Sequence, residues 1–248
     1  MDQSTAADLY GLATAEFYDL VAAGMWDEFG PLLGELLADV DPTAGPVVDI
    51  GVGTGVGLEW VRRAVPGVDL WAIEPSKAMR TGLHARLAID AELRAATTVV
   101  PYPLADAPLP RRACALLLSA ALGHLSPSER RILWAYVVEA LPPGAPAVIG
   151  VLPPDRPLDV PHVRYHRTDV GTYAYEGWQS GTPIGERTMR WELVYRVVDR
   201  ERGDAVVAEH TVRSEWHCDG VADVRTEIEP FGLTLIEHPD CVVVTRNA

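Results

Sequence analysis

The string Asp49-Ile50-Gly51-Val52-Gly53-Thr54-Gly55 decides the fold of this chain of 248 residues. It extends a short apolar run at residues 47–50 and leads into a helical pattern at residues 56–64. Its glycines therefore occupy a turn between a strand and a helix, where they let a ligand approach the backbone and present amide N–H groups. The turn predicts a ligand site at the first strand of an α/β sheet.

Strand and helix patterns alternate around this turn. Strands are predicted at residues 47–50, 70–73, 97–100, 114–119 and 147–152, and helices at 5–24, 26–39, 56–64, 75–87 and 128–141. Alternation at this spacing predicts a parallel sheet that is covered by helices on both faces.

The pattern changes after residue 152. Pro153, Pro154, Pro157 and Pro161 predict an irregular stretch, and three segments with period-2 alternation follow at residues 172–178, 189–197 and 206–216. These segments predict an inserted antiparallel meander. A helix at 220–230 and a hairpin of strands at 233–237 and 241–245 are expected to complete the first sheet at its edge.

Charge and composition exclude several classes of partner. The chain has 35 acidic and 21 basic residues, a net charge of −14, so it lacks the basic surface that a nucleic-acid binder needs. Its three cysteines, Cys114, Cys218 and Cys241, form no CxxC pair, which argues against a disulfide framework and a zinc site. We expect no nucleic-acid partner and no metal.

Two features that the sequence lacks predict where in the cell the protein is found. No apolar run approaches the roughly 20 residues that a membrane span needs, so we expect no membrane partner. The N-terminus lacks the basic region of a signal peptide. We therefore expect a cytoplasmic protein, as a monomer or a homodimer.

Two cofactor classes use a glycine turn of this kind. The nicotinamide fingerprint GxGxxG fails in both registers, because it would need glycine at Val56 or Leu58. What stands is D-x-G-x-G-x-G, with Asp49 two residues before Gly51. This spacing resembles motif I of class I S-adenosylmethionine-dependent methyltransferases.

A second feature agrees with this resemblance. Glu74 ends the second predicted strand, 19 residues beyond Gly55, where a carboxylate can accept hydrogen bonds from both ribose hydroxyls of a nucleoside. Glu74-Pro75-Ser76 resembles the A-x-E-P-S segment of the same family. Ser119–Leu125 and residues 220–246 also resemble the family, so the likeness covers about residues 15–150 and 220–246.

The resemblance implies a cofactor and a set of contacts. The cofactor would be S-adenosyl-L-methionine, with S-adenosyl-L-homocysteine as the product. Asp106 would accept from the exocyclic amine of adenine, and a slip of one position would leave Ala105 or Leu104 to supply backbone contacts instead. The residues expected at the cofactor are Asp49, Gly51, Val52, Gly53, Thr54, Gly55, Glu74, Pro75, Met79, Ala105, Asp106 and Ser119.

The resemblance also implies a fold class and a domain organisation. We expect a Rossmann-like, doubly wound α/β fold with a mostly parallel seven-stranded sheet and an inserted antiparallel β-meander lid. The predicted units are an N-terminal helical cap (1–40), a cofactor-binding domain (41–152 and 218–248) and a substrate lid (153–217).

Catalysis by such a protein needs little from the side chains. The cofactor carries an activated methyl group, so the protein has to hold a nucleophile in line with it, and a base helps only if the acceptor arrives protonated. His124 is the first candidate for a base, because it follows the fourth predicted strand. A structural role in capping the next helix is the alternative for this residue.

Aromatic residues are the candidates for substrate contact. Tyr18 and Trp26 lie on the predicted N-terminal helices, and Tyr175, Trp178, Trp191 and Trp216 lie on the insert. Rings in a lid can stack on an aromatic acceptor or enclose an amine. The alternative for each is packing of a helix or of a sheet face against the core.

We therefore expect methyl transfer to an N or O atom of a small molecule or short peptide. Motifs typical of DNA-base methylation and a cluster of Asp and Asn for magnesium are absent from the sequence. The Ala- and Arg-rich composition, with Lys77 as the only lysine, fits a high-GC genome and suggests natural-product biosynthesis. Two alternatives stay open: a methyltransferase-fold enzyme that catalyses a non-methylating reaction such as a cyclisation, and a non-catalytic partner subunit.

Overall fold

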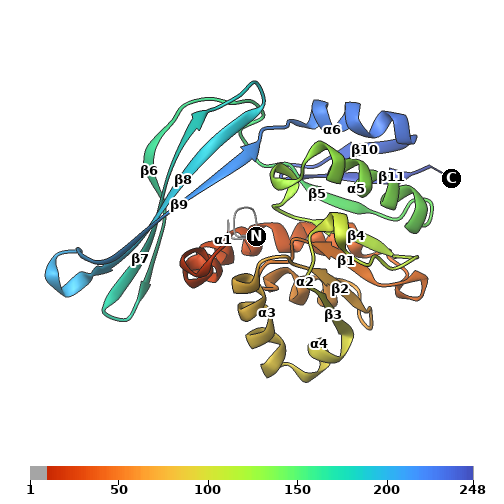
Figure 1. The fold of residues 1–248 in the computed structure, drawn as a ribbon. Helices are drawn as coiled ribbons and strands as arrows, with labels where there is room; N and C mark the ends of the chain where they lie inside the picture. Colours follow the sequence, from red (N-terminus) through yellow and green to blue (C-terminus); the bar gives the residue numbers. More distant parts are fainter. Residues whose placement is uncertain (1–9, 248) are drawn as a thin grey trace, which may run out of the picture.

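The computed structural model describes residues 10–247 and builds two sheets from them (Figure 1). The larger sheet has seven strands in the order β10-β11-β5-β4-β1-β2-β3. Its strands are β1 (Val47–Ile50), β2 (Leu70–Ile73), β3 (Thr97–Val100), β4 (Ala115–Leu118), β5 (Ala147–Gly150), β10 (Leu233–Glu237) and β11 (Cys241–Arg246). All pairs are parallel except those of β11, which runs antiparallel to β5 and β10. The predicted fold class is confirmed.

Helices cover both faces of this sheet, as its fully buried strands require. They are α1 (Leu12–Leu37), α2 (Val56–Ala64), α3 (Lys77–Ile89), α4 (Ala91–Ala96), α5 (Pro127–Ala140) and α6 (Val221–Ile228). Along β1, Val47 packs with the core under α1, α2 and α3, whereas Val48 and Ile50 pack with the core under α5 and α6. Side chains alternate between the faces of a strand, so one short strand supplies both cores.

The N-terminal helix differs from the prediction. Two helices were expected, at 5–24 and 26–39, but a single helix α1 runs from Leu12 to Leu37; residues 5–9 lie outside the described part of the chain. Ala22, Trp26 and Phe29 are buried on one stripe that spans the expected break. Burial of this stripe outweighs the cost of about 1 kcal/mol for glycine inside a helix.

One α-helix and one strand were not predicted. Helix α4 begins after Asp90, whose side chain accepts a hydrogen bond from the Leu93 amide at 2.8 Å. Strand β6 (Val160–Val170) lies where the prolines predicted irregular structure. Pro161 is tolerated because β6 is an edge strand and its pairing with β7 is irregular at that point.

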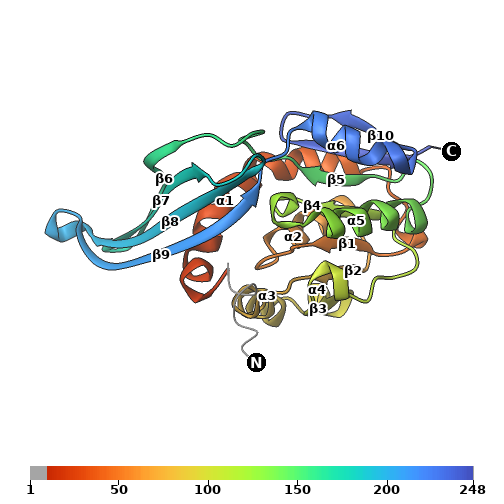
Figure 2. The same cartoon turned by 45° about the horizontal axis from the view of Figure 1, so that its top comes forward.

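The inserted segment forms the second sheet. Its antiparallel strands are β6, β7 (Tyr173–Pro183), β8 (Thr188–Asp199) and β9 (Ala205–His217), in that order across the sheet. This four-stranded sheet of β6 to β9 is named the lid sheet, or lid, after its predicted place in the fold. It projects away from the seven-stranded sheet, and α1 passes beside both sheets (Figures 1 and 2). Phe17 of α1 packs on Tyr175 and Tyr195 of the lid, with ring centroids 5.0 and 4.9 Å apart.

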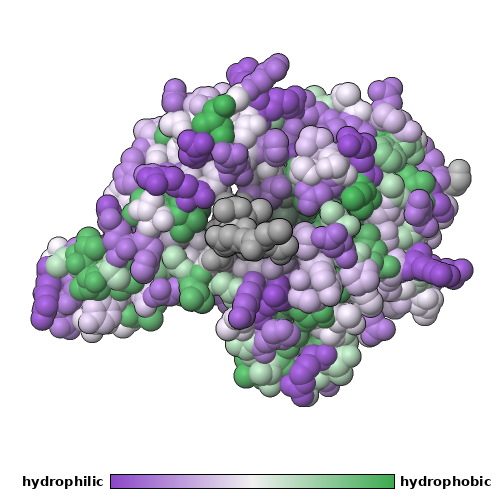
Figure 3. Space-filling view, in the orientation of Figure 1, coloured by the Kyte–Doolittle hydropathy of each residue, from purple (hydrophilic) through white to green (hydrophobic). Residues whose placement is uncertain are grey.

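The surface is mainly polar on the face drawn in Figure 3, where hydrophobic residues form small, separate groups. Val206 and Val207 on β9 are about half exposed, at 53% and 52%. Among residues 10–247, no helix combines the length and the apolar character needed to cross a membrane.

Two glycines of α1 give a matched test of its packing on α2. A Cβ at Gly30 would overlap the Trp60 ring, whereas a Cβ at Gly34 would meet nothing within 4 Å. Gly30→Ala should lower the free energy of unfolding by about 1–3 kcal/mol through overpacking. Gly34→Ala should raise it by up to about 1 kcal/mol. Urea unfolding measures both values; stabilisation by both variants would contradict this contact.

Candidate functional site

The glycine loop between β1 and α2 adopts the conformation that its sequence requires. Gly51, Gly53 and Gly55 have φ values of 74°, 60° and 84°, in the left-handed region that favours glycine. The Gly51 and Val52 amides donate to the Ile73 carbonyl of β2 at 2.9 and 3.1 Å. The loop is therefore fixed to the carboxyl ends of two neighbouring parallel strands.

Glu74 holds the other side of this loop. Its Oε2 accepts from the Gly53 amide at 2.9 Å, and its Oε1 accepts from the Ser76 amide at 2.7 Å. The side chain is buried, and burial raises its pKa against the opposing effect of these two hydrogen bonds. Each carboxylate oxygen keeps acceptor capacity, so Glu74 can also bind two hydroxyls of a ligand in the adjoining cavity.

Asp49 lies inside β1 and is 3% exposed. Its Oδ1 has no hydrogen-bond partner among residues 10–247. Burial, and then the charge of Glu74, raise the pKa of Asp49 to about 8. A buried carboxylate without a partner is costly, and a cationic group beside it would remove that cost. The residue is therefore suited to a ligand ammonium.

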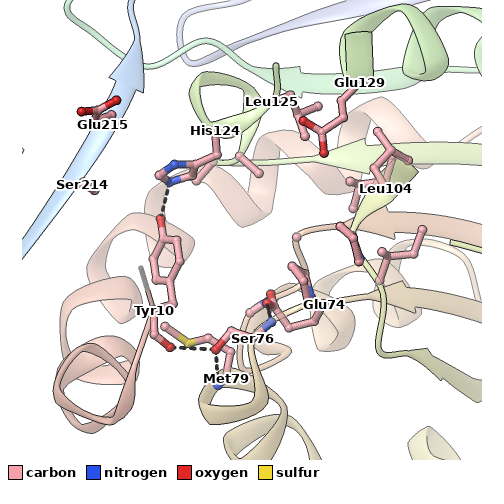
Figure 4. A pocket seen from close by; sticks show the side chains of 18 of the residues that line it. Tyr10, Glu74, Ser76, Met79, Leu104, His124, Leu125, Glu129, Ser214 and Glu215 are labelled. Carbon is pink, nitrogen blue, oxygen red and sulfur yellow. Dashed lines mark hydrogen bonds between the residues drawn. The ribbon is translucent and has the colours of Figure 1, made fainter. Parts of the chain in front are cut away.

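A cavity of about 840 Å³ opens at the glycine loop and Glu74 (Figure 4), whereas Asp49 is buried in β1 and does not line it. The cavity lies where β1 neighbours β4 on one side and β2 on the other, the switch point at which doubly wound sheets bind ligands. Its walls come from the ends of β1 and β2, the segments after β3 and β4, α1 with Tyr10, and the lid. The lid contributes Arg190, Arg213, Ser214 and Glu215.

His124 and Tyr10 meet across this cavity. The Tyr10 hydroxyl lies 2.7 Å from His124 Nε2, and the two side chains point toward each other from different segments (Figure 4). The imidazole also packs edge-on against Trp216, with ring centroids 4.7 Å apart. Burial, and then His217, lower the pKa of His124 to about 4, so the ring is neutral at pH 7.

The alternative role for His124, capping α5, is filled by another residue. Ser126 is the N-cap: its hydroxyl accepts from the Glu129 amide, and Glu129 Oε2 accepts from the Ser126 amide at 2.9 Å. His124 instead ends the 3₁₀ turn η3 (Leu122–His124), which precedes α5. The Nδ1 atom of its ring is buried without a partner among the described residues.

The structure brings some of the predicted cofactor residues together on the cavity wall. These are Gly51, Gly53, Glu74, Pro75 and Met79, together with Tyr18 and His124 from the other predicted sets. Val52, Thr54 and Gly55 complete the loop behind them, and Ser119 follows β4. Ala105 and Asp106 are exposed and do not line the cavity; Leu104, beside them, does.

The predicted aromatic contacts lie in several places. Trp26 is buried on α1 against Phe29, and Trp216 adjoins the cavity through His124. Tyr175 and Trp191 are not on the wall of the main cavity. Trp178 lies on the opposite face of the lid from Tyr175, stacked on His162 with ring centroids 5.2 Å apart. The four lid residues therefore do not converge on one point.

Several wall residues were missed by the sequence analysis. They include Tyr10, Ser76, Leu125, Glu129 and the four lid residues named above. Ser76 was quoted within a motif, but its second role needs the structure: its hydroxyl donates to the Tyr10 carbonyl at 2.7 Å. For Tyr10 and the lid residues no local pattern gives a signal, because their positions depend on contacts between distant segments.

No family model matches the chain, and no curated relative matches it in sequence. Solved structures match it over nearly their whole length. One is the structure of CalS10 with S-adenosylmethionine bound, an amino pentose methyltransferase from Micromonospora echinaspora involved in calicheamicin biosynthesis. The two sequences are 19% identical, the match covers 93% of this chain and 96% of that one, and the TM-score is 0.71.

Two more structures agree. The sugar N-methyltransferase KedS8 from Streptoalloteichus is 20% identical, with 93% of each chain covered and a TM-score of 0.70. DesVI from Streptomyces venezuelae is 20% identical, with 100% of this chain and 99% of that one covered and a TM-score of 0.69. The chain therefore has the fold of class I S-adenosylmethionine-dependent methyltransferases, which the glycine motif had indicated.

Asp49 gives a prediction for stability against pH. Its pKa is about 8 in the folded protein and 3.8 in the absence of such shifts, so between these values the folded state binds the extra proton. The free energy of unfolding should then fall as pH rises from about 4 to about 8, by at most about 1.4 kcal/mol per pH unit for this group. Asp49→Asn should remove this part of the slope in urea unfolding between pH 5 and 7.5.

Asp41→Asn is the matched control. Hydrogen bonds from Thr43 lower the pKa of Asp41, so this exposed carboxylate is already ionised in both states above pH 5. The control should keep the wild-type slope. Equal slopes in wild type and Asp49→Asn would contradict the assignment of a protonated, buried Asp49.

Proposed function

We propose that the protein transfers the methyl group of S-adenosyl-L-methionine to an N or O atom of a small natural-product molecule. One observation carries this proposal: a single cavity joins Glu74 and the glycine loop to a second wall formed by Tyr10, His124 and the lid. The first part suits a nucleoside cofactor, and the second leaves room for an acceptor beside it.

The described residues fit the cofactor group by group. Glu74 would accept from the ribose hydroxyls. Asp49 does not line the cavity, but its buried, unpartnered carboxyl group would favour the ammonium of the methionine part near the glycine loop through its charge. The positive φ of Gly51 and Gly53 keeps side chains out of the space along the loop. When bound, the cofactor supplies a methyl group already activated on a sulfonium.

His124 and Tyr10 would orient the acceptor rather than deprotonate it. A histidine with a pKa of about 4 is too weak a base to take a proton from an alkylammonium at pH 7. An amine acceptor would therefore lose its proton to water before it reacts. The chain would then contribute mainly by excluding water and holding the reacting atoms in line, which is worth several kcal/mol of the barrier.

An amino sugar is the acceptor class that we propose to test first. CalS10 and KedS8 are an amino pentose methyltransferase and a sugar N-methyltransferase. The wall opposite the cofactor is rich in hydrogen-bonding groups: Tyr10, Arg190, Arg213, Ser214 and Glu215. Such a wall suits a polyhydroxylated ring better than an aromatic one.

Calorimetric titration tests the cofactor. The wild type should bind S-adenosylmethionine and S-adenosylhomocysteine with micromolar Kd and should not bind NAD. Glu74→Ala should raise both Kd values about 10- to 150-fold, because it removes charge-assisted hydrogen bonds. The control is Glu92→Ala, a carboxylate with a side chain 90% exposed and outside the cavity, which should leave the Kd unchanged. An unchanged Kd in Glu74→Ala would contradict the ribose assignment.

Kinetics with an amino-sugar acceptor test the role of His124. His124→Asn should lower kcat by less than about 100-fold, because a general base contributes about 10²–10⁴. The Kd of S-adenosylhomocysteine should stay within about threefold, and the pH profile of kcat should keep its shape. His84→Asn, on the exposed face of α3, is the control. Loss of an acidic limb in the His124→Asn profile would instead identify a base.

A transfer reaction must also be separated from a cyclisation that leaves the cofactor intact. Release of one S-adenosylhomocysteine for each product formed would support methyl transfer. Product formation with unchanged S-adenosylmethionine would overturn the proposal in favour of the second class of reaction.

A further inference from the structure

The cavity is lined by two groups of residues, which Figure 4 draws on different sides, with Glu74 below them. Tyr10, His124 and the lid residues form the first group. The second group is formed by Leu104, Leu125 and Glu129. If Glu74 holds a ribose and the first group contacts the acceptor, the base of the nucleoside belongs beside the second group. This argument rests on the proposed function.

The second group of residues combines apolar side chains with one carboxylate. Pro103 and Leu104 from the segment after β3, and Leu125 from the segment after β4, supply apolar walls. Asp106, the carboxylate expected to accept a hydrogen bond from the adenine, is exposed and does not line the cavity. The carboxylate of this group is Glu129.

Glu129 is held in place by the start of α5. Its Oε2 accepts from the Ser126 amide at 2.9 Å and from the Ser126 hydroxyl at 2.7 Å. Among residues 10–247, no group donates a hydrogen bond to its Oε1. Helix α5 packs against the 3₁₀ turn η2 (Leu104–Asp106), and the Glu129 side chain lies in the cavity near Leu104 and Leu125 (Figure 4).

We propose that Glu129, and not Asp106, accepts a hydrogen bond from the exocyclic amine of the cofactor's adenine. A carboxylate can only accept, so it pairs with a 6-amino purine and repels the carbonyl of a 6-oxo purine. Glu129 is thereby the residue that makes the site specific for adenosyl over inosyl compounds.

Glu129→Gln tests this assignment without removing the helix cap. Glutamine fulfils the same capping role at this position of a helix, so the variant should melt like the wild type. The probes are S-adenosylhomocysteine and S-inosylhomocysteine, titrated by calorimetry. The wild type should prefer the adenosyl compound by about 10- to 150-fold, as for a hydrogen bond to a charged group. In Glu129→Gln the preference should fall to within about threefold, because the amide can donate to a 6-oxo group.

Asp106→Asn is the matched control and should keep the wild-type preference. Glu129→Ala is the second variant: it removes both the acceptor and the repulsion, so it too should lose the preference, whatever its effect on the cap. A wild-type preference in both Glu129 variants would overturn the inference, as would loss of preference in Asp106→Asn. Failure of the wild type to bind S-adenosylhomocysteine would overturn the proposed function itself.

Discussion

The burial of the Glu74 carboxylate at the end of β2 is the constraint on which the site depends. A buried charge needs donors, and here they are the backbone amides of Gly53 and Ser76. The Gly53 amide reaches the carboxylate because the loop runs through left-handed glycines. A Cβ at Gly53 would also lie 3.2 Å from the Tyr18 ring. The loop conformation and the strand ends thus satisfy this charge together, and Tyr18 of α1 packs beside the loop.

Helix α1 connects the glycine loop to the lid through contacts on both sides. Asp19 accepts from the Thr54 hydroxyl and pairs with Arg86, whose guanidinium also donates to the Thr54 carbonyl at 3.2 Å. Two residues earlier, Phe17 packs on Tyr175 and Tyr195 of the lid sheet. One turn of α1 therefore contacts the glycine loop on one side and the lid on the other.

The sheet and the placement of the glycine loop and Glu74 at the ends of neighbouring strands could be predicted from the sequence, because their signals are local. The third strand, at 97–100, was placed at its observed bounds, and Glu74 and Gly53 meet because parallel strands end at one edge. The acceptor side could not be predicted. The pairing of Tyr10 with His124 joins residues 114 positions apart, and a bulge in β6 affects which lid side chains share a face. The exposure of Asp106 could not be predicted either, because it depends on a short 3₁₀ turn that buries the neighbouring Leu104.

The wall that we propose for the acceptor is assembled by tertiary contacts that no sequence motif indicates. The buried Arg130 guanidinium donates to the Leu122 and Leu125 carbonyls, both at 3.2 Å, and so holds the turn that presents His124. The same guanidinium pairs with Asp219, where the chain returns from the lid, and Asp219 also binds Arg187 at 2.8 Å. Removing one partner of a buried ion pair typically lowers the free energy of unfolding by about 3–5 kcal/mol. Because Arg130 and Asp219 form such a pair, the turn that carries His124 and the base of the lid are held together as one unit. The position of His124 therefore depends on this unit, whereas the position of Glu74 depends on the ends of β1 and β2.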